Sequence, residues 1–142
     1  MNETLTILLR IAGVGLITLS VLHIPIGKSL KWKEDAARLS MMNESVFHVH
    51  TFFVCLVLVM MGLPAVVDPQ VYLAPTRAGA WLTWSIAIFW AARLYCQWFV
   101  YRADLWRGKR MEFRVHWLFT FIWISLTALF AACGCVQVGW LR

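Results

Sequence analysis

Four long apolar segments, at residues 4–26, 47–67, 78–101 and 113–137, constrain the fold more than any other feature of the sequence. Each is at least about 20 residues long, which is the length that a helix needs to cross a bilayer. Backbone groups in lipid must be hydrogen-bonded internally, and a helix achieves this within one segment. The sequence therefore predicts an all-α integral membrane protein, an up-and-down bundle of four transmembrane helices in which residues 1–142 form a single domain.

The composition supports this class of protein. Only 14% of the residues are charged and 61% are hydrophobic, whereas a soluble domain has roughly a quarter of its residues charged. The first segment is too long for a cleavable signal peptide, has no basic leader before it, and has no small-residue cleavage site before Lys28. We therefore expect it to be a permanent helix.

Basic residues are concentrated in two of the connecting segments, 27–46 and 102–114. These hold Lys28, Lys31, Lys33, Arg38, Arg102, Arg107, Lys109, Arg110 and Arg114. Because cytoplasmic loops are enriched in Lys and Arg, both loops should be cytoplasmic and both termini outside, in a bacterial inner membrane. The net charge of +6 then reflects topology and membrane lipids as partners, not nucleic acid.

The residues between the segments predict where helices begin and end. Pro25 and Gly27 are expected to end the first helix, and Asp68-Pro69 to end the second. Asn43 or Ser45 is placed to cap the start of the second helix. The mixed charged and apolar stretch 28–45 predicts a short helix in the membrane interface.

Three histidines lie about one turn inside different apolar segments, and they are the clearest candidates for a site. His23, His50 and His116 are expected at the same membrane face, with Arg93 and Gln97 at a similar depth on a further segment. At about 1.5 Å per residue, these five residues fall within a slab of roughly 10–15 Å. Ionisable groups are costly in hydrocarbon, so such a cluster predicts a functional pocket near the cytoplasmic face.

Helical spacing predicts which side chains share a face. Arg93, Gln97 and Tyr101 are four apart, and His116 is followed at spacings of four and three by Thr120 and Trp123. His48 and His50 are two apart, about 200° around the helix. We therefore expect His50 to face inward and His48 to face the interface or a neighbouring helix.

Arg93 has no Asp or Glu within the apolar segments to neutralise it. A buried cation without an intramembrane anion predicts an anionic ligand. A haem propionate, a lipid phosphate and a substrate carboxylate all meet that requirement.

The preferred hypothesis is a small membrane redox protein that binds haem b. His50 and His116 would be the axial ligands, with His23 as an alternative, and Arg93, Lys28 or Arg114 would bind the propionates. Gln97 and Tyr101 would complete the pocket, and electrons would pass to or from a partner such as a quinone. The sequence contains no CxxCH attachment motif.

The sequence is also compatible with three other hypotheses. His23, His50 and His116 could bind a transition metal ion such as zinc, copper or iron without haem. The pocket could belong to a small-molecule or lipid-handling membrane protein, with a histidine transferring protons. The chain could also be a non-catalytic subunit of a larger membrane complex or a homo-oligomer, with or without a cofactor, in which small residues such as Gly13 and Ala87 mediate helix contacts.

Catalytic residues are not identified, because no nucleophile elbow, P-loop or paired carboxylates occur. The sequence therefore does not decide whether the protein is an enzyme. Cys133 and Cys135 lie at the outer end of the last segment, and their spacing lacks the redox CxxC pattern. No role is assigned to them.

The first segment resembles one known family. Leu8-Leu9-Arg10-Ile11-Ala12-Gly13, followed by Leu22-His23 and Gly27-Lys28, is similar to the first helix of the DoxX-like four-helix membrane proteins. The resemblance covers about 20 residues and implies no function or residue role for the rest of the chain.

Overall fold

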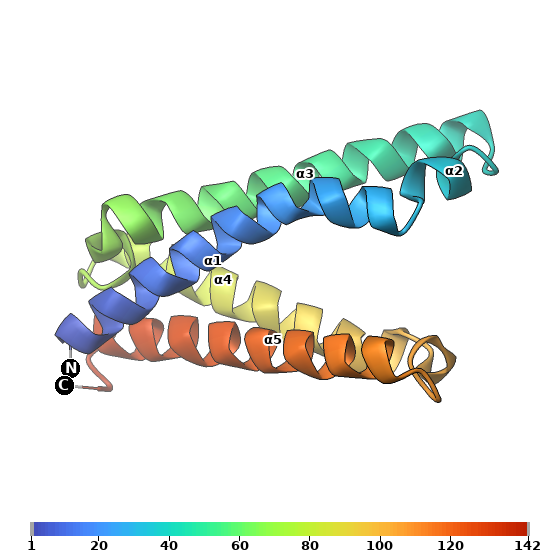
Figure 1. Ribbon diagram of the computed structural model, residues 1–142. Helices are drawn as coiled ribbons and strands as arrows, with labels where there is room; N and C mark the ends of the chain where they lie inside the picture. The colour runs from blue at the N-terminus through green and yellow to red at the C-terminus, as the bar shows by residue number, and fades with distance from the viewer. Residues whose placement is uncertain (1, 142) are drawn as a thin grey trace. The chain divides into compact units, whose positions relative to one another are not determined.

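The computed structural model describes residues 2–141, and the described residues are helical with no strand (Figure 1). The all-α prediction is therefore confirmed. The elements are, in chain order, α1 (Asn2–Ser29), α2 (Trp32–Ala36), α3 (Met41–Val67), the 3-10 helix η1 (Pro69–Tyr72), α4 (Arg77–Tyr95), the π-helix η2 (Cys96–Val100), the 3-10 helix η3 (Ala103–Leu105) and α5 (Arg110–Gln137).

Three helices of the described chain, α1, α3 and α5, are long and apolar enough to cross a membrane. This agrees with the prediction of a membrane protein. The fourth apolar segment differs, because its α-helical part α4 has only 19 residues, with Arg77 at its start and Arg93 in its last turn. The arginines and tryptophans of α4 lower its mean hydropathy.

Several helix boundaries differ from the predictions. Pro25 and Gly27 do not end α1, which continues to Ser29. Gly27 lets the Trp32 ring of α2 pack closely against α1, since a Cβ on it would lie 3.1 Å from that ring. A proline inside a helix interrupts its hydrogen bonding but does not always end it. The predicted short helix between the first two segments is present as α2.

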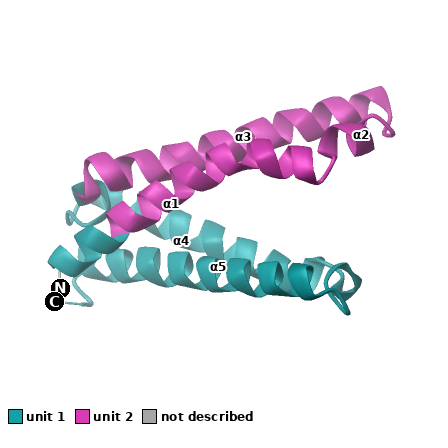
Figure 2. Ribbon diagram, in the orientation of Figure 1, with its two compact units in different colours: residues 1–8, 70–142 teal, residues 9–69 magenta. Residues whose placement is uncertain are grey.

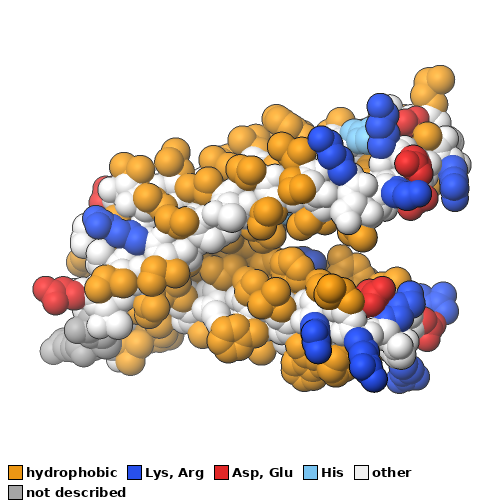
Figure 3. All heavy atoms as spheres, in the orientation of Figure 1, with side chains coloured by type: hydrophobic (Ala, Val, Ile, Leu, Met, Phe, Trp, Pro, Cys, Tyr) orange, Lys and Arg blue, Asp and Glu red, His pale blue; other side chains and the backbone are white. Residues whose placement is uncertain are grey.

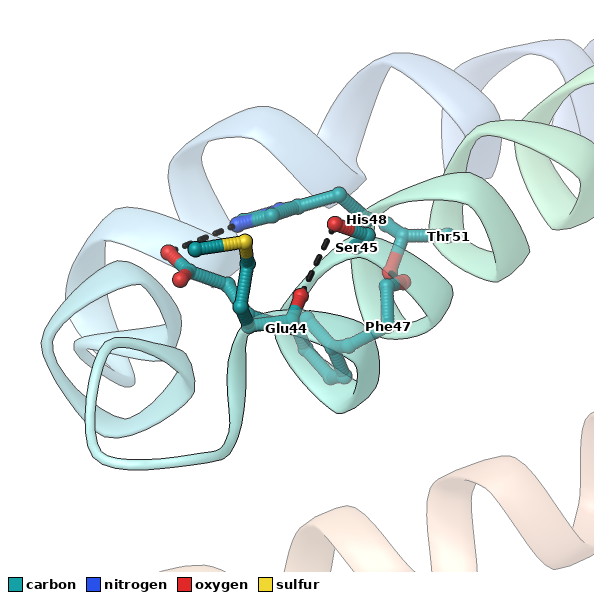
Figure 4. A network of polar contacts seen from close by, with 6 residues as sticks. Glu44, Ser45, Phe47, His48 and Thr51 are labelled. Carbon is teal, nitrogen blue, oxygen red and sulfur yellow. Dashed lines mark hydrogen bonds and ion pairs between the residues drawn. The ribbon is translucent and has the colours of Figure 1, made fainter.

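The second helix begins at Met41, not at residue 47, because Ser40 caps it by accepting a hydrogen bond from the Asn43 amide at 3.4 Å. The prediction that Asn43 or Ser45 is the cap was therefore wrong. Ser45 donates instead to the Met41 carbonyl at 2.9 Å (Figure 4). The helix ends at Val67, directly before Asp68-Pro69, as predicted.

The chain forms two compact units (Figure 2). The α1–α3 unit, Leu9–Pro69, is held by a close crossing of its two long helices. A Cβ on Gly13 would lie 2.6 Å from the Gly62 carbonyl oxygen, and a Cβ on Gly62 would lie 2.8 Å from that of Gly13. Further along, the Ser20 hydroxyl donates to the Cys55 carbonyl at 3.0 Å. Small residues thus allow the two backbones to touch.

The other unit contains the chain from Gln70 onward and the first turns of α1. Its main feature is the α4–α5 hairpin, in which positions spaced alternately by four and three residues face each other. On α4 and η2 these are Gly79, Thr83, Ile86, Trp90, Arg93 and Gln97, and on α5 they are His116, Thr120, Trp123, Thr127, Phe130, Gly134 and Gln137.

We call these residues the hairpin seam. The helices are antiparallel, because Trp90 stacks on Trp123 with ring centroids 5.0 Å apart while Gln97, further along η2, contacts His116. The seam follows the alternating spacing typical of paired helices. Polar side chains occur along its whole length, which is unusual for a hairpin whose outer surface is apolar.

Basic side chains gather over α2 and the adjoining helix ends in one unit, and over the loop between α4 and α5 in the other (Figure 3). The charged and apolar surfaces are therefore separated along the helices. At the opposite end of the α4–α5 hairpin, the Gln137 amide donates to the Ala74 carbonyl at 3.1 Å.

Candidate binding site on the α4–α5 hairpin

Four of the six candidate residues lie together at one end of the hairpin seam. Arg93 comes from the last turn of α4, Gln97 from η2, Tyr101 from the residue after η2, and His116 from α5. His23 and His50 belong to the α1–α3 unit. The six candidate residues are therefore divided between the two units.

The π-helix η2 shapes the end of α4 that carries the site. The Tyr101 amide donates to the Cys96 carbonyl at 3.1 Å, a bond between residues five apart. Gln97 is buried within this wider turn. Such π-turns inside helices are frequent at functional sites. The sequence contains no signal from which we could have predicted it.

A continuous hydrogen-bonded relay links the two helices. The Arg93 guanidinium donates to Oε1 of Gln97 at 3.3 Å, and Nε2 of Gln97 lies 2.8 Å from Nδ1 of His116. Sequence spacing predicted that Arg93 and Gln97 share a face, and the structure shows that this face meets the face of His116. The relay uses one of the five N–H donors of the guanidinium.

Aromatic rings enclose both ends of the relay. The Arg93 Cζ atom lies 5.4 Å from the Tyr101 ring centroid and 5.0 Å from that of Trp123. These are cation–π distances. Trp106, after η3, stacks on the His116 ring with a centroid separation of 3.9 Å and an interplanar angle of 18°. Trp106 was not predicted to belong to the site, because a tryptophan near a helix end is typical of a membrane interface.

The site contains hydrogen-bond donors but no acid. The ion pairs found among the described residues are Lys31–Glu34, Arg38–Asp35, His48–Glu44 and Arg102–Asp104, and none includes Arg93. In the adjoining layers of the seam, the Thr120 hydroxyl and the indole nitrogens of Trp90 and Trp123 are buried without hydrogen-bond partners in the described chain. Buried polar groups are normally paired, so these groups call for an explanation.

His23 and His50 each bond to their own helix. Nδ1 of His23 lies 2.7 Å from the Leu19 carbonyl oxygen, and Nδ1 of His50 lies 2.9 Å from that of Val46. A carbonyl oxygen only accepts, so both rings carry a proton on Nδ1 and leave the Nε2 lone pair available when neutral. Within the described residues no group of three or more His, Cys, Asp and Glu side chains could hold a metal ion.

The expected difference between His48 and His50 is not observed, because both side chains are exposed. His48 faces Glu44, with Nε2 lying 3.9 Å from a carboxylate oxygen at the start of α3 (Figure 4). All four cysteines are free thiols, and Cys133 is buried.

No protein-family model matches the chain, and no curated protein and no solved structure is significantly similar to it. The similarity of the first segment to DoxX-like proteins therefore does not establish a family.

Proposed function

We propose that the protein is an integral membrane protein that binds the acidic group of an amphipathic ligand at Arg93. The observation that carries the proposal is the environment of this cation: an amide and two aromatic rings contact it, and no carboxylate pairs with it in the described chain. A carboxylate or phosphate would supply the missing negative charge and pair well with the free N–H groups of the guanidinium.

The proposal includes a fourth membrane span, formed by α4 together with η2. Pairing with α5 along the hairpin seam would bring this segment into the membrane with its polar residues turned toward its partner. The basic loops would be cytoplasmic by the positive-inside rule. Cysteines introduced as Pro75→Cys and Arg107→Cys into a cysteine-free background should react with an impermeant reagent from opposite sides of the membrane, and labelling from the same side contradicts the fourth span.

The ligand proposal is tested with a brominated fatty acid and the matching fatty alcohol, by quenching of tryptophan fluorescence in detergent. Trp90 and Trp123 lie within the seam and should report a bound chain. The acid should bind and the alcohol should bind more weakly. Arg93→Gln should lower affinity for the acid about 10- to 100-fold, since a hydrogen bond to a charged group contributes roughly 1.5–3 kcal/mol.

The matched control is Arg77→Gln, which removes an exposed arginine from the start of the same helix. This variant should bind the acid as the wild type does. Equal binding of acid and alcohol, or equal losses in the two variants, rejects a specific role for Arg93. Mass spectrometry of co-purified molecules then separates a phospholipid from a free acid as the natural source of the anionic group.

Haem b is a second candidate ligand, for the α1–α3 unit, because His23 and His50 each present the nitrogen that an axial ligand uses. In metal-binding histidines, the other ring nitrogen commonly donates to a backbone carbonyl, as Nδ1 does in both residues. Protein expressed with ample haem should show a Soret band that sharpens on reduction, and His23→Ala or His50→Ala should alter it. A featureless spectrum rejects haem and the associated electron transfer to a quinone.

A further inference from the structure

The order of donors and acceptors along the Arg93–Gln97–His116 relay determines which ring nitrogen of neutral His116 carries the proton. A guanidinium has donors and no acceptor, so the Gln97 atom that faces Arg93 must be its carbonyl oxygen. The amide nitrogen, which only donates, is then the atom 2.8 Å from Nδ1 of His116. Nδ1 must therefore accept, and the proton of the neutral ring must be on Nε2.

This arrangement is opposite to that of the other two candidate histidines. In His23 and His50, a carbonyl oxygen faces Nδ1 and requires the proton there. In His116, Nε2 carries the proton and has no hydrogen-bond partner among the described residues. The Trp106 ring covers one face of the imidazole, and the Nε2 donor lies on the ring edge.

We infer that Arg93, acting through Gln97, fixes neutral His116 as a hydrogen-bond donor at Nε2, so that the ligand must present an oxygen acceptor to it. The requirement that the ligand presents an oxygen rests on the proposed function, whereas the tautomer of His116 follows from the relay alone. Arg93 and Gln97 are positioning residues in this scheme. The same tautomer removes the Nε2 lone pair that a haem iron or other metal ion would need, so His116 is not an axial ligand while the relay is intact.

The buried donors near the relay support an acceptor-bearing ligand. The Thr120 side chain is 1% exposed and that of Trp123 is 4% exposed, and the polar atom of each lacks a partner in the described chain. Both lie on the α5 face that carries His116. The Trp123 indole can only donate, whereas the Thr120 hydroxyl can donate or accept. A carboxylate can accept from several donors at once, whereas a ligand without an acceptor cannot pair with the Arg93 guanidinium or with Nε2 of His116.

The test is long-range proton–nitrogen NMR on the full chain in detergent with labelled histidine, at about pH 8, where a free imidazole is mostly neutral. The His116 signals are assigned by their loss in His116→Asn. The wild type should show the pattern of an Nε2-protonated ring, and His23 and His50 should show the Nδ1-protonated pattern. An Nδ1-protonated or averaged pattern for His116 overturns the inference directly, before any variant of Arg93 or Gln97 is made.

Two variants test the relay itself. Gln97→Glu places an oxygen acceptor against Nδ1 and should move the proton there, whereas Arg93→Met frees the amide to rotate and should give a mixture of tautomers. Circular dichroism confirms that each variant is folded. An unchanged His116 pattern in a folded Gln97→Glu protein contradicts the role of Gln97. If the wild-type pattern is as expected but the fatty acid does not bind, the proposed function fails and the relay stands.

Discussion

Gly13 of α1 and Gly62 of α3 touch backbone to backbone: a Cβ placed on either one would lie within 2.8 Å of the carbonyl oxygen of the other. No side-chain movement relieves such a contact, because backbone atoms form it. The two long helices of the α1–α3 unit would have to move apart to accept a methyl group at either position.

Gly13→Ala should therefore destabilise the protein by about 1–3 kcal/mol, the usual cost of overpacking. Gly15→Ala is the matched control, since a Cβ there meets nothing within 4 Å. In a helix interior alanine is favoured over glycine by roughly 0.5–1 kcal/mol, so this variant should be as stable as the wild type or slightly more so. Thermal unfolding in detergent measures both, and equal stability of the two variants excludes the close crossing.

Gly134→Ala should destabilise the α4–α5 hairpin, because the added Cβ would lie 2.8 Å from the Trp84 ring. This neighbour is a side chain, so making it smaller should relieve the clash. In a double-mutant cycle, Gly134→Ala should cost less in a Trp84→Leu background than in the wild type. Additive effects of the two substitutions would show that these residues are not in contact.

Tyr72, in the short helix η1 outside the apolar spans, provides a prediction about pH. Burial raises the pKa of Tyr72 from 10.0 to about 12. The folded state therefore holds the phenol proton at a pH where the unfolded state has lost it. The contribution of Tyr72 to stability is complete below pH 10 and declines as the pH rises from 10 toward about 12, by at most about 1.4 kcal/mol per pH unit.

The measurement compares the free energy of unfolding of the wild type and Tyr72→Phe across this pH range. The wild type should lose more stability than the variant. Tyr72 packs edge-on against Phe130 at a centroid distance of 5.2 Å, a contact that phenylalanine retains. Parallel stability curves would mean that the phenol ionises as easily in the folded as in the unfolded protein.

Gln137 connects the last turn of α5 to the chain before α4, with its amide donating to the carbonyls of Ala74 at 3.1 Å and Val71 at 3.5 Å. Gln137→Leu would leave these acceptors without that donor, at a cost of about 1–3 kcal/mol. Ser125→Ala, an exposed position on the same helix, should change stability little. Hydrogen exchange should also increase around Ala74 in Gln137→Leu, and unchanged exchange there would argue against the contact.

The long helices could be predicted from the length of their apolar segments, but their ends could not. The first turns of α3 and α5 contain polar or charged residues and resemble a loop, yet the chain is helical from Met41, where Ser40 caps it, and from Arg110. Periodicity reports which residues are apolar, whereas a cap depends on one side chain and its local geometry. Boundaries were therefore the least accurate part of the prediction.

The candidate site was predictable where it depended on helical spacing. Arg93 and Gln97 are four apart, and Gln97 and His116 were expected at similar depths, so their contact follows from two antiparallel helices. The stacking of Trp106 on His116 was not predictable, because it depends on how the loop between the helices folds back. The opposite tautomers of His116 and His23 also follow only from their partners in space.

The π-helix makes the site depend on the number of residues in the chain as well as on their identity. A π-turn holds one more residue than an α-helical turn, so deleting a single residue within 96–100 would allow α4 to continue as a regular helix. The residues after such a deletion would keep nearly the same direction around the helix axis, because the deletion removes the residue that the π-turn adds. A deletion in the regular part of α4 has no such compensation and would turn the residues after it by about 100°, so the helix should tolerate the loss of one residue better within 96–100 than within 77–95.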